Sequence, residues 1–298
     1  MKVRRREVLV GALGGAVTLA CAGAQRADEP PTVDVAASLA DIEARLGGRV
    51  GVYVADARTG RWMGRRVDER FAMCSTFKWL LVAACLARVD RGELSLSDRV
   101  TFGEEDLLEH APLTREHVTA GSLSLEELAE GAVVVSDNTA ANLLLSRIGG
   151  PPGLTQFARA QGDPVTRLDR SEPALNENLA SDPRDTTSPR AMGELLRRVV
   201  LGDVLSHQSR QRLLGWMRES ETGKRRLRAG LPSEWRTGDK TGSCGRGAVN
   251  DVAITFPMGD APFIVAAFTS DSTAPLDDLE AAHAEIGRLV ARFVSRRA

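Results

Sequence analysis

The sequence has almost no net charge and lacks the residue patterns that hold metal ions. Its 39 Lys and Arg residues nearly balance its 40 Asp and Glu residues, which leaves a formal net charge of −1. Such a balance predicts no basic surface for nucleic acid. The four histidines are scattered, without H-x-H or H-E-x-x-H spacing, and the cysteines form no pair at metal-ligand spacing. We therefore expect no metal, no cofactor and no nucleic-acid partner.

Internal repeats and low-complexity tracts are also missing, which argues against a repeat architecture. The chain has 298 residues, of which 43% are hydrophobic. That is enough to bury a large core, either as one big domain or as two lobes.

Long hydrophobic runs are scarce, and the one present lies at the N-terminus, from Val8 to Ala24. It is shorter than the roughly 20 residues that span a bilayer. It is also rich in Gly and Ala and follows a basic start, which is typical of a secretory signal. The pair Arg5-Arg6, followed by Glu-Val-Leu, indicates the twin-arginine type. We predict a signal peptide over residues 1–24 and no transmembrane segment in the mature protein.

The end of this segment leaves two processing routes open. Cleavage after Ala22 or Ala24 fits the A-x-A pattern, whereas Cys21 in "TLAC" would instead carry a lipid anchor. Both routes place the mature protein outside the cytoplasmic membrane, either periplasmic or secreted. We expect it to be a monomer.

Strand patterns at both ends of the chain enclose a helical middle. Residues 49–66 place valines at alternate positions, at Val50, Val52 and Val54, and turn at Thr59-Gly60, which predicts a strand hairpin. Residues 71–216 carry helical periodicity, and Ser188 is expected to cap a helix that has Pro189 at its first position. Three further strands are predicted at Trp235–Gly245, Asn250–Phe256 and Phe263–Asp271. A final helix is predicted from an apolar face formed by Leu279, Ala282, Ile286, Leu289, Val290 and Phe293.

This order predicts an α/β fold of the α+β type, in which helices flank an antiparallel sheet and an all-helical lobe packs beside it. We expect one domain over residues 33–298, with an α/β lobe at about 33–68 and 217–298 and a helical lobe at about 69–216. The functional site is expected between the lobes, where ligand sites are common. A long polar loop, Arg167–Pro189, interrupts the helical part; loops of this length in a compact domain are usually functional.

A candidate nucleophile stands at the start of the helical region. Ser75 precedes Lys78 by three residues, in a run of Phe, Trp, Leu, Val and Ala. Residues at i and i+3 share a helix face. A lysine in apolar surroundings loses affinity for its proton and can serve as a base. The alternative is a capping serine followed by a lysine whose stem lies along the surface.

Two companion motifs make the S-x-x-K pattern specific. Ser136-Asp137-Asn138 lies between two helical stretches, and Lys240-Thr241-Gly242 lies on a predicted strand. The three motifs in this order resemble those of the class A serine β-lactamases, and the resemblance covers the chain from about residue 33 to 298. It implies the β-lactamase/transpeptidase-like fold, β-lactam substrates and a serine acyl-enzyme.

A fourth motif lies in the long loop, where Glu172-Pro173-Ala174-Leu175-Asn176 resembles the family's E-x-x-L-N. By resemblance, Glu172 and Asn176 hold and activate the water that hydrolyses the acyl-enzyme. General-base help of this kind is worth about 10²–10⁴-fold in rate. Whether Lys78 or Glu172 takes the proton from Ser75 during acylation stays open.

The resemblance also implies the remaining roles. Ser136 would pass a proton to the departing lactam nitrogen, and Asn138 would hold the substrate's acylamide side chain. The oxyanion would bind the backbone N–H groups of Ser75 and Ser243. The substrate carboxylate would be received by Lys240, Thr241, Gly242 and Ser243, with Arg226 as a further candidate.

Three features at the edge of the site follow from the same resemblance. Arg170 and Asp185 flank the loop where the family closes it with an ion pair. His110 stands at the site mouth, either stacked on the substrate or as a plain surface residue. Cys74 and Cys244 occupy the two positions that are bonded in the serine carbapenemase subgroup, whereas Cys85 is expected to be a small buried apolar residue.

Taken together, these residues predict an enzyme that hydrolyses penicillins, cephalosporins and, from the Cys74/Cys244 pair with Ser243 and His110, carbapenems. Two alternatives share the fold: a D,D-peptidase, and a penicillin-binding sensor that stays acylated. Both are disfavoured by Glu172 and Asn176, because the D,D-peptidases lack this loop glutamate and a sensor that stays acylated needs no base aimed at a water.

Overall fold

The protein is described by a computed structural model over residues 35–259 and 261–295. The predicted signal peptide, its cleavage sites and Cys21 lie outside these residues. Among the described residues, no helix has both the length and the hydropathy needed to cross a bilayer.

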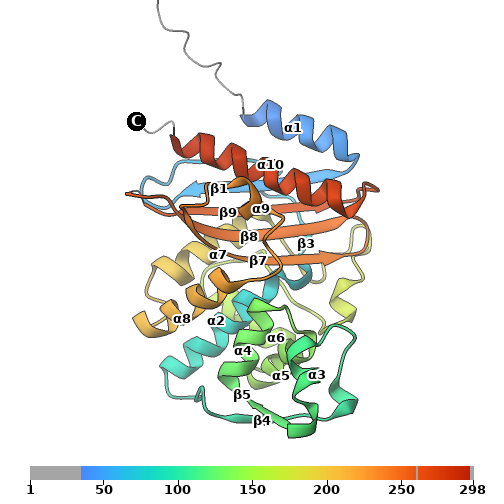
Figure 1. Ribbon diagram of the computed structural model, residues 1–298, viewed down its shortest axis with the longest axis vertical. Coiled ribbons are helices and arrows are strands. Elements are labelled where there is room, and N and C mark those ends of the chain that lie inside the picture. The colour runs from blue at the N-terminus through green and yellow to red at the C-terminus, as the bar shows by residue number, and fades with distance from the viewer. Residues whose placement is uncertain (1–34, 260, 296–298) are drawn as a thin grey trace, which may run out of the picture. The chain divides into compact units, whose positions relative to one another are not determined.

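The centre of the fold is a five-stranded antiparallel sheet (Figure 1) with the order β2-β1-β9-β8-β7. Its strands are β1 (Arg49–Asp56), β2 (Trp62–Arg65), β7 (Arg236–Cys244), β8 (Ala248–Phe256) and β9 (Phe263–Ser270). The hairpin and the three later strands predicted from the sequence are therefore present. Strand β7 forms one edge, so one side of its backbone is left for other partners.

Helices cover both faces of this sheet. Helices α1 (Val35–Leu46) and α10 (Leu276–Ser295) lie together on one face, above the strands in Figure 1, with the short α9 (Leu227–Gly230) against α10. The predicted apolar stripe of α10 faces the sheet, and its outermost member, Phe293, meets the Phe263 ring edge-on. Helix α7 (Pro189–Leu201) packs on β1 and β9, and α8 (His207–Glu219) packs on β7.

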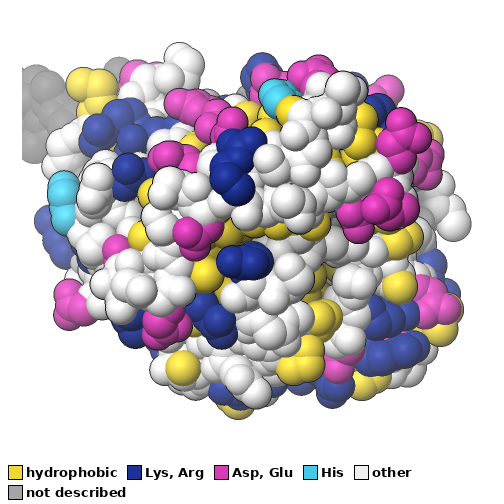
Figure 2. Space-filling model, turned by 90° about the horizontal axis from the view of Figure 1, so that it is seen from below, with side chains coloured by type: hydrophobic (Ala, Val, Ile, Leu, Met, Phe, Trp, Pro, Cys, Tyr) yellow, Lys and Arg dark blue, Asp and Glu magenta, His cyan; other side chains and the backbone are white. Residues whose placement is uncertain are grey.

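The remaining helices form a second group, below the sheet in Figure 1, around α2 (Phe77–Asp90). Residues 77–87 of α2 are buried on every side, as expected for a helix that is hydrophobic all round. The others are α3 (Pro112–Glu116), α4 (Leu125–Val134), α5 (Asn138–Arg147) and α6 (Gly150–Ala160), with the two-stranded sheet of β4 (Arg99–Thr101) and β5 (Ser122–Ser124). The face formed by this group carries acidic and basic side chains interspersed (Figure 2).

Short elements position the motifs at the junction of the two groups. The 3₁₀ helix η1 (Cys74–Thr76) runs directly into α2, and η4 (Ala174–Asn176) lies within the long loop. Strand β3 (Phe71–Ala72) leads into η1 and pairs with β6 (Thr186–Thr187) at the end of that loop. After the loop, Ser188 caps α7 as predicted, because its Oγ accepts a hydrogen bond from the N–H of Ala191.

Candidate active site

Ser75 lies between β3 and α2, and hydrogen bonds from β8 hold the backbone that leads into it. The Asn250 Nδ2 of β8 donates to the carbonyls of Ala72 and Met73, at 2.9 and 3.2 Å. Cys74 adopts a left-handed backbone, with φ of +46°, a conformation that non-glycine residues rarely take and that occurs preferentially at active sites. This turn places Ser75 at the edge of strand β7.

Gly242 of β7 allows that close approach. A Cβ at Gly242 would lie 2.8 Å from Met73 O, 2.9 Å from Ser75 N and 2.9 Å from Thr76 N. All three are backbone atoms, so only a residue without a side chain fits there. The contact brings the backbone N–H of Ser75 beside the strand that carries Ser243.

Lys78 is fully buried one turn after Ser75. Its Nζ lies 3.2 Å from Glu172 Oε1 and donates to Ser136 O at 2.8 Å, to Ser136 Oγ at 3.3 Å and to Asn138 Oδ1. Burial lowers the pKa of Lys78, because the charged form loses its hydration, while the nearby Glu172 and Asp137 carboxylates act in the opposite direction. The lysine is therefore closer to neutrality than an exposed one.

Ser136 stands between two lysines. It follows α4 with a φ of +61°, and its Oγ accepts hydrogen bonds from Lys78 and, at 3.0 Å, from Lys240 Nζ. Burial lowers the pKa of Lys240 well below its usual value, and the neighbouring Lys78 lowers it further. A hydroxyl between two ammonium groups of lowered pKa is well placed to relay a proton.

The carboxylate of Glu172 faces Ser75 from the long loop. Glu172 is 3% exposed, and its Oε1 lies 3.4 Å from Ser75 Oγ. Its Oε2 accepts a hydrogen bond from Asn176 Nδ2 at 2.6 Å. Glu172 precedes Pro173 through a cis peptide bond. Both E-x-x-L-N residues therefore converge on one carboxylate beside the serine.

Asn142, which sequence analysis missed, holds the backbone of Glu172. Its Nδ2 donates to Glu172 O at 2.9 Å, and its Oδ1 accepts from Glu172 N at 3.0 Å. The available signal was its position on α5, four residues after Asn138, since residues at this spacing share a helix face.

The loop is closed at its base by Arg170 and Asp185. Arg170 Nε lies 2.6 Å from Asp185 Oδ2, and Asp185 Oδ1 accepts the N–H groups of Asp169 and Arg170 at 2.8 and 2.9 Å. Asp185 is 1% exposed. Charge-assisted hydrogen bonds of this kind are roughly twice as strong as neutral ones. The structure thus contains the ion pair that was expected at this place.

Arg226 is buried and contacts the last residues of β7. Its guanidinium is buried and donates to Ser243 Oγ at 2.7 Å, to Gly242 O at 3.0 Å and to Asn250 O at 2.8 Å. These contacts let Arg226 orient Ser243 and the β7 edge. Beside them, the hydroxyls of Thr222 and Thr241 share a hydrogen bond.

The Cys74–Cys244 disulfide is present, with Cα atoms 5.8 Å apart. It joins the residue before Ser75 to the residue after Ser243. Cys85 is free and buried in α2, as expected, and burial raises the pKa of its thiol to about 12.

His110 is exposed and comes from the segment before α3. Its Nε2 lies 3.0 Å from the carbonyl oxygen of Val135, next to Ser136, and its own carbonyl accepts from the N–H of Asn138 at 2.9 Å. The residue therefore borders the Ser136–Asn138 segment. Asp137 anchors that segment, because its carboxylate accepts from Ala140 N and Thr114 N. Among the described residues, no cluster of His, Cys, Asp and Glu has the arrangement of a metal site.

Comparisons with known proteins agree with this geometry. Residues 34–294 match the family model described as the β-lactamase enzyme family. The chain is 44% identical over 280 residues to "Beta-lactamase L2" of Stenotrophomonas maltophilia, covering 93% of this chain and 92% of that protein. It is 43% identical over 236 residues to "Carbapenem-hydrolyzing beta-lactamase KPC" of Klebsiella oxytoca, covering 79% and 80% of the two chains.

Solved structures give the same result. The fold matches the last common ancestor of Gram-negative bacteria (GNCA4) class A β-lactamase with a TM-score of 0.85 and 53% identity, over 87% of this chain and 98% of that one. A putative class A β-lactamase, PenP from Rhodopseudomonas palustris, matches with a TM-score of 0.85 and 50% identity, over 87% and 98% of the two chains.

Proposed function

The chain belongs to the β-lactamase enzyme family, as a class A serine β-lactamase that hydrolyses β-lactams, and from this premise we propose how its residues perform the reaction. Ser75 is the nucleophile. The observation that carries the proposal is the convergence of Ser75 Oγ, Lys78 Nζ and the Glu172 carboxylate, with Glu172 Oε1 3.4 Å from the hydroxyl and 3.2 Å from the amine. The proton of Ser75 passes to this Lys78–Glu172 pair as the lactam ring opens.

The oxyanion of the tetrahedral intermediate is stabilised by the backbone N–H groups of Ser75 and Ser243. The tight contact of Gly242 with Ser75 N supports this proposal, since it brings the two donor segments together. Donors fixed in this way need no reorganisation when the charge develops.

Ser136 delivers a proton to the departing lactam nitrogen. The support is its pair of lysine donors, Lys78 and Lys240, whose pKa values are both lowered by burial. An amine of lowered pKa exchanges protons more readily near neutral pH.

Deacylation uses Glu172 as the general base toward a water held by Asn176. The Asn176 Nδ2 binds Glu172, while its Oδ1 is buried and has no hydrogen-bond partner among the described residues. A buried acceptor of this kind needs a donor, and a water between Asn176 and Glu172 supplies one.

Substrate binding falls to the residues along β7 and α5. Asn138 receives the acylamide group, and the carboxylate of the substrate is received by Lys240, Thr241, Gly242 and Ser243. Arg226 acts through Ser243, because it donates to the Ser243 hydroxyl. His110 contacts the substrate at the mouth of the site.

The Ser75→Ala variant tests the assignment of the nucleophile. Mass spectrometry after mixing the parent with benzylpenicillin should detect a penicilloyl adduct, and the variant should form none. An adduct of the same stoichiometry in Ser75→Ala would remove Ser75 from the mechanism. Arg197→Gln, a surface change outside the site, serves as the matched variant that must retain the adduct.

The proposed spectrum comprises penicillins, cephalosporins and carbapenems. Support comes from the Cys74–Cys244 disulfide, which ties the nucleophile turn to the strand of Ser243, and from the 43% identity to a relative named as carbapenem-hydrolysing. Imipenem hydrolysis followed by ultraviolet absorbance tests the carbapenem part. A stable imipenem acyl-enzyme without turnover would refute that part while leaving penicillin hydrolysis intact.

We further propose that residues 33–298 fold as one domain of two lobes and act as a monomer. The twin-arginine-like segment supports export to the periplasm or the medium, with a lipid anchor at Cys21 as the second route. Mass spectrometry of the exported protein decides between a start after Ala22 or Ala24 and a lipidated Cys21.

A further inference from the structure

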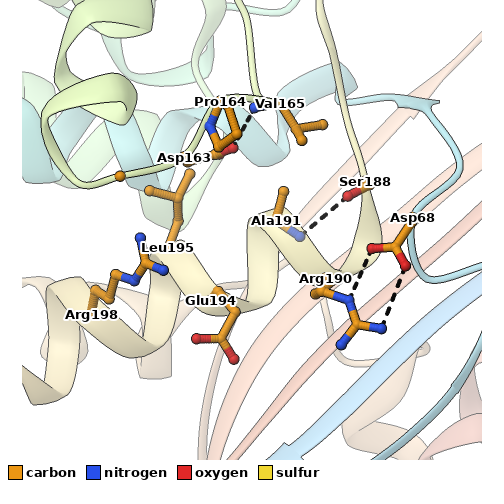
Figure 3. Close-up of a pocket in the computed structure, with 11 residues that line it drawn as sticks. Asp68, Asp163, Pro164, Val165, Ser188, Arg190, Ala191, Glu194, Leu195 and Arg198 are labelled. Carbon is orange, nitrogen blue, oxygen red and sulfur yellow. Dashed lines mark hydrogen bonds and ion pairs between the residues drawn. The ribbon is translucent and has the colours of Figure 1, made fainter.

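Polar groups that the proposed mechanism leaves unused lie both far from strand β7 and directly against it. Far from it, Asp163 borders a cavity of about 170 Å³ between residues 162–165 and helix α7 (Figure 3). No residue with a proposed role lines that cavity. Against β7 lies the segment of residues 220–226, between α8 and α9, and its side chains reach residues that have such a role.

The segment 220–226 offers one polar partner to each of three side chains of β7. Asp239, Thr241 and Ser243 alternate along the strand, and alternate residues of a strand point to the same face. The three side-chain pairs are Ser220–Asp239 at 3.2 Å, Thr222–Thr241 at 2.5 Å and Arg226–Ser243 at 2.7 Å. Two of these pairs involve the hydroxyls to which the proposed function assigns the substrate carboxylate.

Backbone contacts hold Thr222 in place between β7 and the helical group. On one side, a Cβ at Gly223 would overlap the carboxyl group of Asp239, so only glycine lets the segment lie this close to the strand. On the other side, Glu221 N donates to Val134 O at 3.1 Å, at the end of α4. Thr222 lies between these two contacts and is half-buried.

The Arg226–Ser243 pair has a fixed direction. A guanidinium has N–H donors and no acceptor, so Ser243 Oγ accepts and the single proton of its hydroxyl remains free. Ser243 is exposed, which makes that proton available to a carboxylate in the site. Arg226 thereby leaves Ser243 as a hydrogen-bond donor toward the substrate.

The distances around Thr222 favour the same direction in the Thr222–Thr241 pair. Only one of the two hydroxyl protons can lie between oxygens 2.5 Å apart. If Thr222 donates that proton, Thr241 keeps its own for the substrate. The competing acceptor, Ser220 Oγ, is 3.5 Å from Thr222 Oγ1, which is beyond the usual range of an O–H···O hydrogen bond. Thr241 is therefore the better acceptor for the Thr222 proton.

We propose that Thr222 is a positioning residue for recognition of the substrate carboxylate: its hydroxyl donates to Thr241 Oγ1 and so directs the Thr241 proton toward the carboxylate. The inference rests on the proposed function, in which Thr241 receives that group. A hydroxyl that accepts one hydrogen bond becomes a stronger donor in the next, because consecutive hydrogen bonds polarise one another. Thr222 thus does for Thr241 what Arg226 does for Ser243.

Thr222→Val tests this role, because valine has the shape of threonine without the hydroxyl. The readout is the ratio of kcat/KM for benzylpenicillin to kcat/KM for its methyl ester, in which the carboxylate has lost its charge. We expect the ratio to fall about tenfold in Thr222→Val, the scale of one hydrogen bond to a charged group, and to return to the parent value in Thr222→Ser. An unchanged ratio in Thr222→Val, or equal losses with both substrates, would overturn the proposal.

Thr237→Val provides the matched control. Thr237 lies on β7 four residues before Thr241, and its hydroxyl forms the same kind of pair, with Thr255 Oγ1 at 2.8 Å. Neither Thr237 nor Thr255 has a role in the proposed mechanism. The ratio of Thr237→Val should equal that of the parent, and thermal unfolding should show one cooperative transition for each valine variant. A ratio that falls as far in Thr237→Val as in Thr222→Val would reject a specific role of Thr222.

A double-mutant cycle identifies the residue through which Thr222 acts. Thr241→Val should lower the ratio at least as far as Thr222→Val, and the variant with both changes should be no lower than Thr241→Val alone. Additive losses would reject Thr241 as the partner.

Mass spectrometry of the parent with benzylpenicillin separates this inference from the proposed function. A penicilloyl adduct in the parent, together with an unchanged ratio in Thr222→Val, would overturn the role of Thr222 alone. A parent that forms no adduct would overturn both.

Discussion

Substitution of Gly242 by alanine is a sharp perturbation of the proposed oxyanion hole. The added Cβ would meet three backbone atoms at 2.8–2.9 Å, among them Ser75 N. Ordinary van der Waals contact begins at about 3.5 Å. Strand β7 or the Ser75 turn must therefore shift by roughly 0.6 Å on this van der Waals scale.

The expected cost follows from that shift. A misplacement of about 1 Å costs roughly 10²-fold in rate, and complete loss of one oxyanion donor costs about 10²–10³-fold. We expect kcat to fall by about 10- to 100-fold. Overpacking should also destabilise the fold by about 1–3 kcal/mol, which is less than the full stability of a typical domain.

Gly245→Ala provides the matched control. Gly245 lies just beyond β7, and a Cβ there would have nothing within 4 Å. Its carbonyl, which accepts from Asn178 Nδ2 at 2.7 Å, is retained in alanine. Activity and stability of this variant should equal those of the parent.

Stopped-flow acylation by nitrocefin and thermal unfolding of the three proteins give the result. The reasoning fails if Gly242→Ala keeps its acylation rate within threefold of the parent, or if Gly245→Ala is impaired to the same extent. A loss of stability without a loss of rate would show that the strand contact supports the fold only.

Three further predictions follow from contacts around the site. Asn142→Ala should slow deacylation by about 10- to 100-fold, because Glu172 loses both hydrogen bonds to its peptide groups. Quenched-flow mass spectrometry should show acyl-enzyme in the steady state. Absence of the acyl-enzyme would contradict the role of Asn142 in positioning Glu172. Burial lowers the pKa of His283 to about 3, with Arg226 adding to the effect, so the stability that this neutral histidine contributes is complete above pH 6.5 and is lost as pH falls toward 3. Denaturant titrations should show up to about 1.4 kcal/mol lost per pH unit there, and His283→Gln should reduce that slope. In a chain without Cys21, thiol titration of the unreduced, unfolded protein should find Cys85 alone, and three thiols before reduction would rule out the Cys74–Cys244 bond. The partners of this bond are 170 residues apart. Breaking it should lower the free energy of unfolding by about 5 kcal/mol in the chain-entropy view.

The elements that the sequence predicted well are those whose signal is local. The strand predicted at Trp235–Gly245 differs from β7 by one residue at each end, and the helix cap at Ser188 is present. Motif spacing also identified the side chains that meet at Ser75. Each of these depends on neighbouring residues, which a sequence displays directly.

The features that could not be predicted depend on contacts between distant segments. Asn250 binds the carbonyl of Ala72, just before the Ser75 turn, from 178 positions away, and no local pattern marks it. The same holds for the position of α7. The apolar face of α7 predicts a helix, but the packing of this helix on β1 and β9 is set by the whole fold. The cavity beside Asp163 arises only when two such segments come together.

The central claim is that Glu172 drives hydrolysis of the ester on Ser75, and time-resolved mass spectrometry of Glu172→Ala with benzylpenicillin tests it most directly. The parent should return to its free mass as the substrate is consumed. The variant should accumulate a stoichiometric penicilloyl-enzyme and release it at least about 10²-fold more slowly. Turnover by Glu172→Ala near the parent rate, with no accumulated adduct, would contradict the account.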